Sequence, residues 1–166
     1  MIPWKKAEPE AWKTAAQLLA TDRGGLVYQP LVGAYEDVIE IDFVSMYPTI
    51  MSHFNVSPET VNCRCCENER VPEIGYTICE KRHGLVSRTL EPIIDKRVRY
   101  KKIRGEARID KNELLEKTVD ARQTALKWLL VCCFGYLSYR NARFGRIEAH
   151  EAVCAFARDR LMRARE

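Results

Sequence analysis

Apolar residues recur along this chain with two spacings, and each spacing predicts one kind of element. Near the start, Trp12 and Leu19 share one helical stripe, which predicts a helix over residues 8–20. Two β-rich runs follow, at 26–28 and 38–43, and each predicts a strand. The first part of the chain therefore reads as a helix followed by two strands.

The rest of the chain predicts helices. A short helix is expected over 48–54, and two longer ones over about 89–104 and 112–134, with Gly105 near the end of the first. A last helix is expected over 148–165. The short connection between the two long helices favours an antiparallel hairpin. The predicted class is α+β, with a small sheet beside helices and a two-helix hairpin.

Length and composition suit a globular protein. A chain of 166 residues fits one domain or two incomplete ones, and a hydrophobic content of 46% supports a core. No apolar run reaches membrane-spanning length, and the start lacks the apolar stretch of a signal peptide. We therefore expect an intracellular, cytoplasmic protein without a membrane partner.

Charge is distributed unevenly between the two halves. Residues 1–80 carry 6 Lys and Arg against 12 Asp and Glu, whereas residues 81–166 carry 21 against 11. A basic half beside an acidic half is typical of a surface that faces a polyanion, although an ordinary solvated helical surface is an equally good explanation of charge alone.

The segment from Ile41 to Met51 is the most informative about function. One carboxylate, Asp42, follows an apolar run, and a Ser-x-Tyr-Pro sequence follows at residues 45–48. A carboxylate at the end of an apolar run can bind a metal ion. The simpler alternative is an aspartate that caps the next helix.

Two pairs of polar residues on the expected hairpin add to this picture. Arg97 and Lys101 are four residues apart, as are Gln123 and Lys127, so each pair projects from one face of its helix. Opposed faces of this kind would form a cationic cleft suited to a triphosphate. Two unrelated surface stripes would show the same spacing.

The chain resembles the archaeal branch of family B DNA polymerases. Residues 41–51 are similar to motif A, Asp-x-x-Ser-Leu-Tyr-Pro-Ser-Ile, and residues 122–136 to motif B, Lys-x-x-x-Asn-Ser-x-Tyr-Gly. The segments 24–27, 35–38 and 55–60 match the same branch in the same order. The resemblance covers nearly the whole chain.

The resemblance implies a domain plan. Residues 1–23 would be an N-terminal helical segment, 24–85 a palm portion with motif A and a cysteine-rich insertion, 86–135 a fingers hairpin with motif B, and 136–166 a return to the palm. The implied function is part of a DNA-directed DNA polymerase that binds primer-template DNA and an incoming dNTP.

The resemblance also implies roles for individual residues. Asp42 would be a catalytic carboxylate that binds Mg²⁺, with the backbone carbonyl of Phe43 as a further ligand, and Tyr47 would be the ring that excludes a 2′-hydroxyl. Two Mg²⁺ ions would support phosphoryl transfer. The residues implied in nucleotide binding are Ser45, Met46, Tyr47, Arg97, Lys101, Gln123 and Lys127.

Departures from the family pattern leave alternatives open. Val131 and Cys132 stand where motif B has Asn-Ser, and Phe134 replaces its tyrosine. Loss of an amide contact of about 1–3 kcal/mol would slow turnover roughly ten- to hundredfold. The acidic turn of motif C, Tyr-x-Asp-x-Asp, does not occur in these residues. The chain is expected to be inactive alone: a fragment, one part of a split polymerase whose second chain carries motif C, or a non-catalytic DNA-binding or scaffolding protein derived from a polymerase.

The cysteines form two groups. Cys132, Cys133 and Cys154 lie in apolar helical surroundings and are expected to be small buried hydrophobes. The other group, Cys63, Cys66, Cys79 and His83, has the spacing of a structural zinc site, with Cys65 as a competing ligand. A Cys66–Cys79 disulfide, as in some heat-adapted relatives of the family, and free thiols are the alternatives. A third functional hypothesis is an interaction module that zinc stabilises and whose basic helices bind nucleic acid only through its phosphates.

Overall fold

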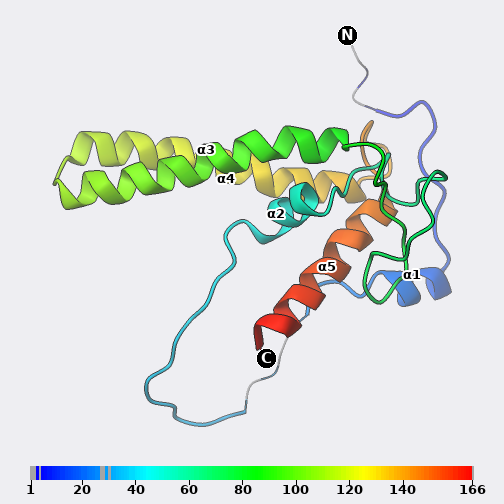
Figure 1. Ribbon diagram of the computed structural model, residues 1–166, viewed down its shortest axis with the longest axis horizontal. Helices are drawn as coiled ribbons and strands as arrows, with labels where there is room; N and C mark the ends of the chain where they lie inside the picture. The colour runs from blue at the N-terminus through cyan, green and yellow to red at the C-terminus, as the bar shows by residue number, and fades with distance from the viewer. Residues whose placement is uncertain (1–2, 4, 27–28, 30, 166) are drawn as a thin grey trace.

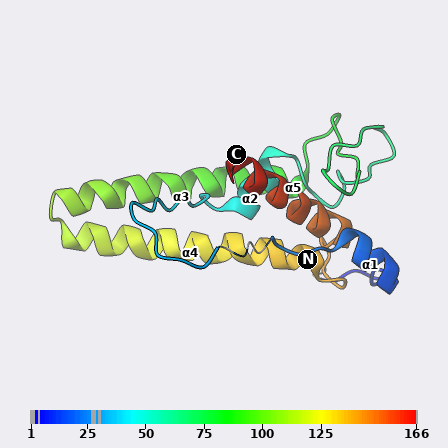
Figure 2. The ribbon, with the colours of Figure 1, turned by 90° about the horizontal axis from the view of Figure 1, so that it is seen from below.

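The protein is built around a long helical hairpin. The computed structural model describes residues 3, 5–26, 29 and 31–165 (Figure 1). Within these residues the helices are α1 (Ala15–Thr21), α2 (Met46–His53), α3 (Leu85–Ile109), α4 (Glu113–Ser138) and α5 (Ile147–Arg165). Helices α3 and α4 run antiparallel, and α2 and α5 pack near the base of the hairpin (Figures 1 and 2). None of the helices in the described ranges is long and apolar enough to span a membrane.

The predicted α+β fold with a small palm sheet is wrong. The described residues contain no sheet, and their strand-like pairing is limited to isolated antiparallel bridges between Lys5 and Ala142 and between Val61 and Ile78. Residues 38–43 form no regular element, and their side chains are exposed. Residues 27 and 28 of the other expected strand lie outside the described residues. A single extended segment is not stable as a strand without a neighbour that accepts its hydrogen bonds.

The helical predictions hold better, with shifted bounds. The N-terminal helix begins at Ala15 rather than residue 8, because Thr14 caps it: the Gln17 amide donates to the Thr14 hydroxyl at 3.3 Å, and Gln17 accepts from the Thr14 amide at 2.8 Å. Trp12 therefore precedes the helix, and its exposed ring faces the Arg140 guanidinium at 4.1 Å.

The hairpin helices run past their predicted ends. Helix α3 continues through Gly105 to Ile109, and α4 begins after Asn112, whose side chain accepts from the Leu115 amide at 3.1 Å. A glycine inside a helix costs about 1 kcal/mol relative to alanine. Packing of α3 against α4 along the hairpin outweighs that cost.

The core lies where α2, α4 and α5 meet. Met51 of α2, Leu130 of α4 and Val153 of α5 are buried, and the rings of Phe54 and Phe156 stack at 4.1 Å. Leu161, near the C-terminal end of α5, is 38% exposed. Small residues on α5 allow α2 to approach this helix closely, so α2 packs directly against α5.

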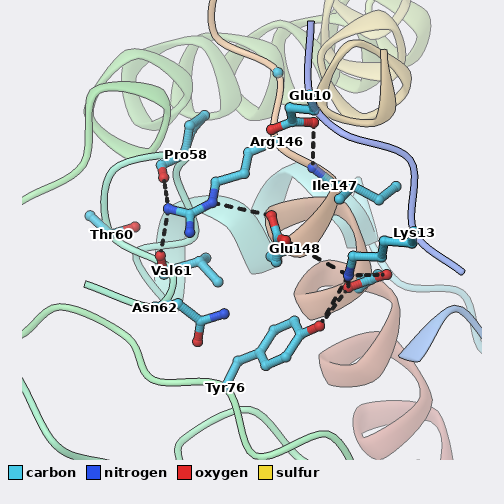
Figure 3. A network of polar contacts seen from close by, with 12 residues as sticks. Glu10, Lys13, Pro58, Thr60, Val61, Asn62, Tyr76, Arg146, Ile147 and Glu148 are labelled. Atoms are coloured by element: carbon cyan, nitrogen blue, oxygen red, sulfur yellow. Dashed lines mark hydrogen bonds and ion pairs between the residues drawn. The ribbon is translucent and has the colours of Figure 1, made fainter. Parts of the chain in front are cut away.

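The start of α5 is fixed by a polar network (Figure 3). The Arg146 guanidinium donates to the carbonyls of Pro58 at 2.7 Å and Val61 at 2.9 Å. On the other side, the Ile147 amide donates to the Glu10 carboxylate at 3.2 Å. These contacts tie the loop after α2 and the N-terminal segment to one helix end.

One turn further along α5, Glu151 is fully buried. Its carboxylate accepts from Lys13 at 2.6 and 2.8 Å, from Thr21 at 2.7 Å and from Tyr76 at 2.8 Å. Although burial alone would lower the pKa of Lys13, its contacts with Glu151 and Tyr76 raise it above the ordinary value. One ammonium and two hydroxyl partners satisfy the hydrogen-bonding capacity of this buried carboxylate. The network therefore holds α1 and the 62–83 loop against α5.

Candidate functional site

A cavity of about 640 Å³ lies between α2, α3 and α4. That volume is within the range of small-molecule sites. Every residue that the resemblance assigned to metal or nucleotide binding around motifs A and B lines it: Asp42, Phe43, Ser45, Met46, Tyr47, Arg97, Lys101, Gln123 and Lys127. Three separate segments of the sequence thus meet at one cavity.

Arg97 is the central cation of the cavity. Its side chain is only 8% exposed, and one guanidinium nitrogen donates to the hydroxyl of Ser45. The Nε atom is buried and has no hydrogen-bond partner among the described residues. A buried guanidinium with a free donor is costly unless an anion or another acceptor reaches it. Lys101, one turn further along α3, and Lys127 on α4 are exposed and line the same cavity.

Ser45 shapes the entry into α2. Its backbone is left-handed, with φ 50° and ψ 47°, which is uncommon for a residue other than glycine. As the N-cap of α2 it makes no side-chain capping bond, because its hydroxyl contacts Arg97 instead. The Ser45 side chain therefore accepts no hydrogen bond from the backbone amides in the first turn of α2, which contains Met46 and Tyr47.

Tyr47 stands against an aromatic stack. Its ring centroid lies 4.3 Å from that of Phe134, and Phe134 lies 4.3 Å from His150 of α5. Burial raises the pKa of Tyr47, so its phenol stays neutral at physiological pH. The sequence prediction missed this support. Its signal was available, because Phe134 follows Lys127 by seven residues, two turns along the same helix face.

Gln123 lines the cavity and also takes part in hydrogen bonds within the hairpin. Its side chain is 8% exposed, and its amide nitrogen donates to Asp120 at 3.1 Å and to the Thr124 hydroxyl at 3.1 Å. A hydrogen bond from Arg104 of α3 lowers the pKa of Asp120 below its ordinary value. Gln123 therefore lines the cavity but is already engaged in a network that joins the two hairpin helices.

Asp42 is exposed and is the one acidic residue among the described residues that line the cavity. Carboxylate and carbonyl oxygens are the ligands that Mg²⁺ prefers, and Mg²⁺ sites commonly use one or two carboxylates together with phosphate oxygens. Asp42 and the backbone carbonyl of Phe43 are oxygen ligands of this kind, and both residues line the cavity with the cations of α3 and α4. A second carboxylate is not supplied by the described lining residues.

The cysteine-rich loop gathers four sulfurs. The Sγ atoms of Cys63, Cys65, Cys66 and Cys79 all lie within 4.8 Å of one another. His83 is not in this group; Cys65, the competing ligand of the sequence analysis, takes its place. All seven cysteines are free, so the alternative Cys66–Cys79 disulfide is not formed. On α4, Cys132 is exposed rather than buried.

Comparisons with known proteins agree on one family. A profile of the family described as DNA polymerase family B matches residues 8–166. DNA polymerase 2 of Saccharolobus solfataricus is 36% identical over 166 residues, which is 100% of this chain and 24% of that protein. The DNA polymerase of Thermococcus gorgonarius is 37% identical over 136 residues, 81% of this chain and 17% of the relative.

A solved structure adds a similarity of shape. The family B DNA polymerase from the hyperthermophilic archaeon Pyrobaculum calidifontis matches with a TM-score of 0.60 and 31% identity, over 74% of this chain and 16% of that one. The chain thus spans about a quarter or less of the length of these relatives.

Proposed function

Since the chain belongs to DNA polymerase family B, we propose that it forms part of a DNA-directed DNA polymerase whose incoming dNTP binds in the cavity between α2, α3 and α4. The observation that carries this proposal is the convergence of Asp42, Tyr47, Arg97 and Lys127 on one cavity. In this arrangement residues 24–85 serve as a palm portion, 86–135 as fingers, and 136–166 as a return to the palm.

The triphosphate would occupy the cationic side of the cavity. Arg97 offers a buried donor that has no partner among the described residues, and Lys101 and Lys127 add two flexible ammonium groups. The uncapped first turn of α2 presents backbone amides and the positive end of a helix dipole, which also favour phosphate oxygens. These groups neutralise the charge that develops during phosphoryl transfer and need no rearrangement at that moment.

The sugar and the metal would occupy the opposite side. Tyr47, fixed against Phe134, would lie under the deoxyribose and exclude a 2′-hydroxyl. Asp42 and the Phe43 carbonyl would hold Mg²⁺, which lowers the pKa of the attacking hydroxyl and stabilises the leaving oxygen when it is bound. DNA would approach over the basic second half of the chain.

We propose that a second catalytic carboxylate comes from another segment or from a second polymerase chain. Asp42 is the single acid among the described residues lining the cavity. The adjoining extended segment is also apolar and uncovered: Val38 is 74% exposed, Ile39 84% and Ile41 77%. Exposed apolar side chains of this kind mark a surface that another segment or chain can cover. A segment that covers them would lie beside Asp42.

A non-catalytic scaffold is the second candidate, and one observation favours it. Val131 lines the cavity where motif B has an asparagine, and it is 52% exposed. An inert branched side chain facing the nucleotide pocket removes a polar contact without adding packing. This reading predicts duplex DNA binding without nucleotide incorporation.

Primer extension separates the two candidates. The chain is assayed alone and with a companion polypeptide that carries the second catalytic carboxylate of a related polymerase. The polymerase proposal predicts incorporation only with the companion, loss of it in Asp42→Asn, and its retention in Asp110→Asn, which alters an exposed acid beyond the end of α3. If no companion restores incorporation while duplex binding persists, the scaffold function is correct.

A further inference from the structure

The loop between α2 and α3 contains a cluster of four thiols with a spacing suited to a metal ion. The Cys65 sulfur lies 3.6 Å from that of Cys79 and 3.9 Å from that of Cys66, and Cys63 completes the group within 4.8 Å. A tetrahedral zinc ion with Zn–S bonds of about 2.3 Å places its sulfurs roughly 3.8 Å apart. A disulfide would need about 2.05 Å. The separations of 3.6 and 3.9 Å therefore match two edges of a metal-centred tetrahedron, and the whole group is compact enough to surround one ion.

Backbone pairing brings the four ligands together from both ends of the loop. Val61 and Ile78 form an antiparallel bridge, and the Cys79 amide donates to the Thr60 carbonyl at 2.9 Å. This pairing sets Cys63 and Cys79 on neighbouring segments, and both are buried, at 8% and 2% exposure. The buried pair fixes half of the site, and the following turn supplies Cys65 and Cys66.

A hydrogen-bond donor and a cation lie beside the sulfurs. The Glu80 amide donates to Cys66 Sγ at 3.4 Å, and the charge of the Arg82 guanidinium acts on the Cys79 sulfur. Four thiolates around one divalent ion leave a net charge of about −2, which an amide donor and a cation stabilise.

We propose that Cys63, Cys65, Cys66 and Cys79 bind one structural Zn²⁺ ion. Four soft thiolate ligands in tetrahedral array select zinc over Mg²⁺ or Ca²⁺, which prefer oxygen ligands. With four protein ligands no coordination position is open for a substrate, so the role is structural. The proposal stands apart from the polymerase function, because it rests only on the geometry of the loop.

The ion would stabilise the junction between α2 and α3. Asn55, which follows α2, donates from its side chain to the carbonyls of Cys79 at 2.9 Å and Arg82 at 2.8 Å. Its side-chain oxygen accepts from the amide of Gly84, the N-cap of α3, at 2.7 Å. Fixing Cys79 therefore fixes Asn55, and with it the relative position of the two helices that hold Tyr47 and Arg97.

Metal analysis tests the site directly. The chain, purified under reducing conditions without chelator, should contain about one zinc per molecule, and Cys63→Ser and Cys79→Ser should lose it. Cys132→Ser, which removes an exposed thiol of α4, should keep it. A folded wild-type chain that contains no zinc and takes none up on titration would overturn the proposal, as would an intact mass showing a disulfide within the cluster.

The ligand set has its own test. Cys65→Ser should lower zinc content and weaken binding, whereas His83→Ala should change neither; the reverse pattern would contradict the assignment. Because a serine variant can fail to fold, the wild-type chain is also titrated with Co²⁺. Absorption typical of tetrahedral cobalt with four thiolates is expected, and a spectrum with mixed nitrogen and sulfur ligation argues against Cys65.

Discussion

The ring of Tyr47 rests on the ring of Phe134, with centroids 4.3 Å apart and planes inclined by 37°. Phe134 in turn stacks on His150 at 4.3 Å, so Tyr47 is supported by a residue of α4 and one of α5. The position of the proposed sugar-selecting ring is thus set by side chains outside motif A.

Shortening Phe134 should loosen sugar selection. Aromatic contacts of this kind are worth about 0.5–1.5 kcal/mol, so Phe134→Ala should lower the preference for deoxyribonucleotides over ribonucleotides roughly two- to tenfold in an active assembly. Phe134→Tyr keeps the ring and should behave as wild type. The ratio of dNTP to rNTP incorporation measures the effect. Equal ratios for the alanine and tyrosine variants would remove Phe134 from this role.

Removing the cation that faces Glu151 should destabilise the fold strongly. Lys13→Met leaves a fully buried carboxylate with hydroxyl partners only, and breaking a buried pair in this way costs about 3–5 kcal/mol. Lys102→Met removes an exposed lysine whose distance to Glu106 is 4.0 Å, and it should cost less than about 0.5 kcal/mol. Urea unfolding compares the two, and similar losses would show that Lys13 is not needed at Glu151.

Alanine substitutions at Gly84, the N-cap of α3, and at Gly105, inside α3, should change the stability of the fold in opposite directions. A Cβ at Gly84 would collide with Cβ of Ser57 and lie 3.1 Å from Cγ2 of Thr60, both fully buried residues. Overpacking of this kind costs about 1–3 kcal/mol. At Gly105 nothing lies within 4 Å of an added Cβ, so Gly105→Ala should stabilise the helix by about 0.5–1 kcal/mol. Thermal melts of both variants test the pair, and a stable Gly84→Ala protein would contradict the packing.

His150 should make the fold sensitive to mild acid. Burial lowers its pKa below the ordinary value, against a hydrogen bond with the Phe134 backbone and the charges of Asp22 and Glu151. The unfolded chain, with a histidine pKa of about 6.5, then binds more protons than the folded one as the pH falls through that value. The contribution of His150 to stability is therefore complete above about pH 6.5 and declines below it until the lower folded pKa is reached.

The comparison of His150→Phe with wild type isolates this effect. The variant should show a smaller loss of unfolding free energy between pH 8 and pH 5.5, measured by urea titration at each pH. His53→Phe changes an exposed histidine and should retain the wild-type slope. Identical slopes for all three proteins would show that His150 does not titrate across the transition.

The sequence was sufficient to locate the polar side of the cavity. Arg97 and Lys101 share a helix face whatever the exact helix ends, since a spacing of four survives shifts in the bounds. Asp42 and Tyr47 could be placed next to them because the ordered motifs resemble those of one family. The spacing of Phe134 from Lys127 places its side chain on the cavity side of α4, but its contact with Tyr47 depends on how the helices cross, which periodicity does not specify.

The expected sheet shows the limit of local pattern. Val38, Ile39 and Ile41 are typical strand residues, yet a strand exists only where another segment pairs with it, and none does among the described residues. The choice of Cys65 over His83 has a similar cause. Spacing suited both, and only the path of the loop around the Val61–Ile78 bridge brings the sulfurs together.

Triphosphate binding by the folded chain decides whether the cavity between α2, α3 and α4 is a nucleotide site. In calorimetric titrations with a dNTP and Mg²⁺, Lys127→Met should weaken binding roughly ten- to hundredfold, because a hydrogen bond to a charged group contributes about 1.5–3 kcal/mol. Lys117→Met removes an exposed lysine of α4 outside the cavity and should bind as wild type does. Absence of dNTP binding by the folded wild-type chain, or equal affinities for the two variants, would contradict the assignment.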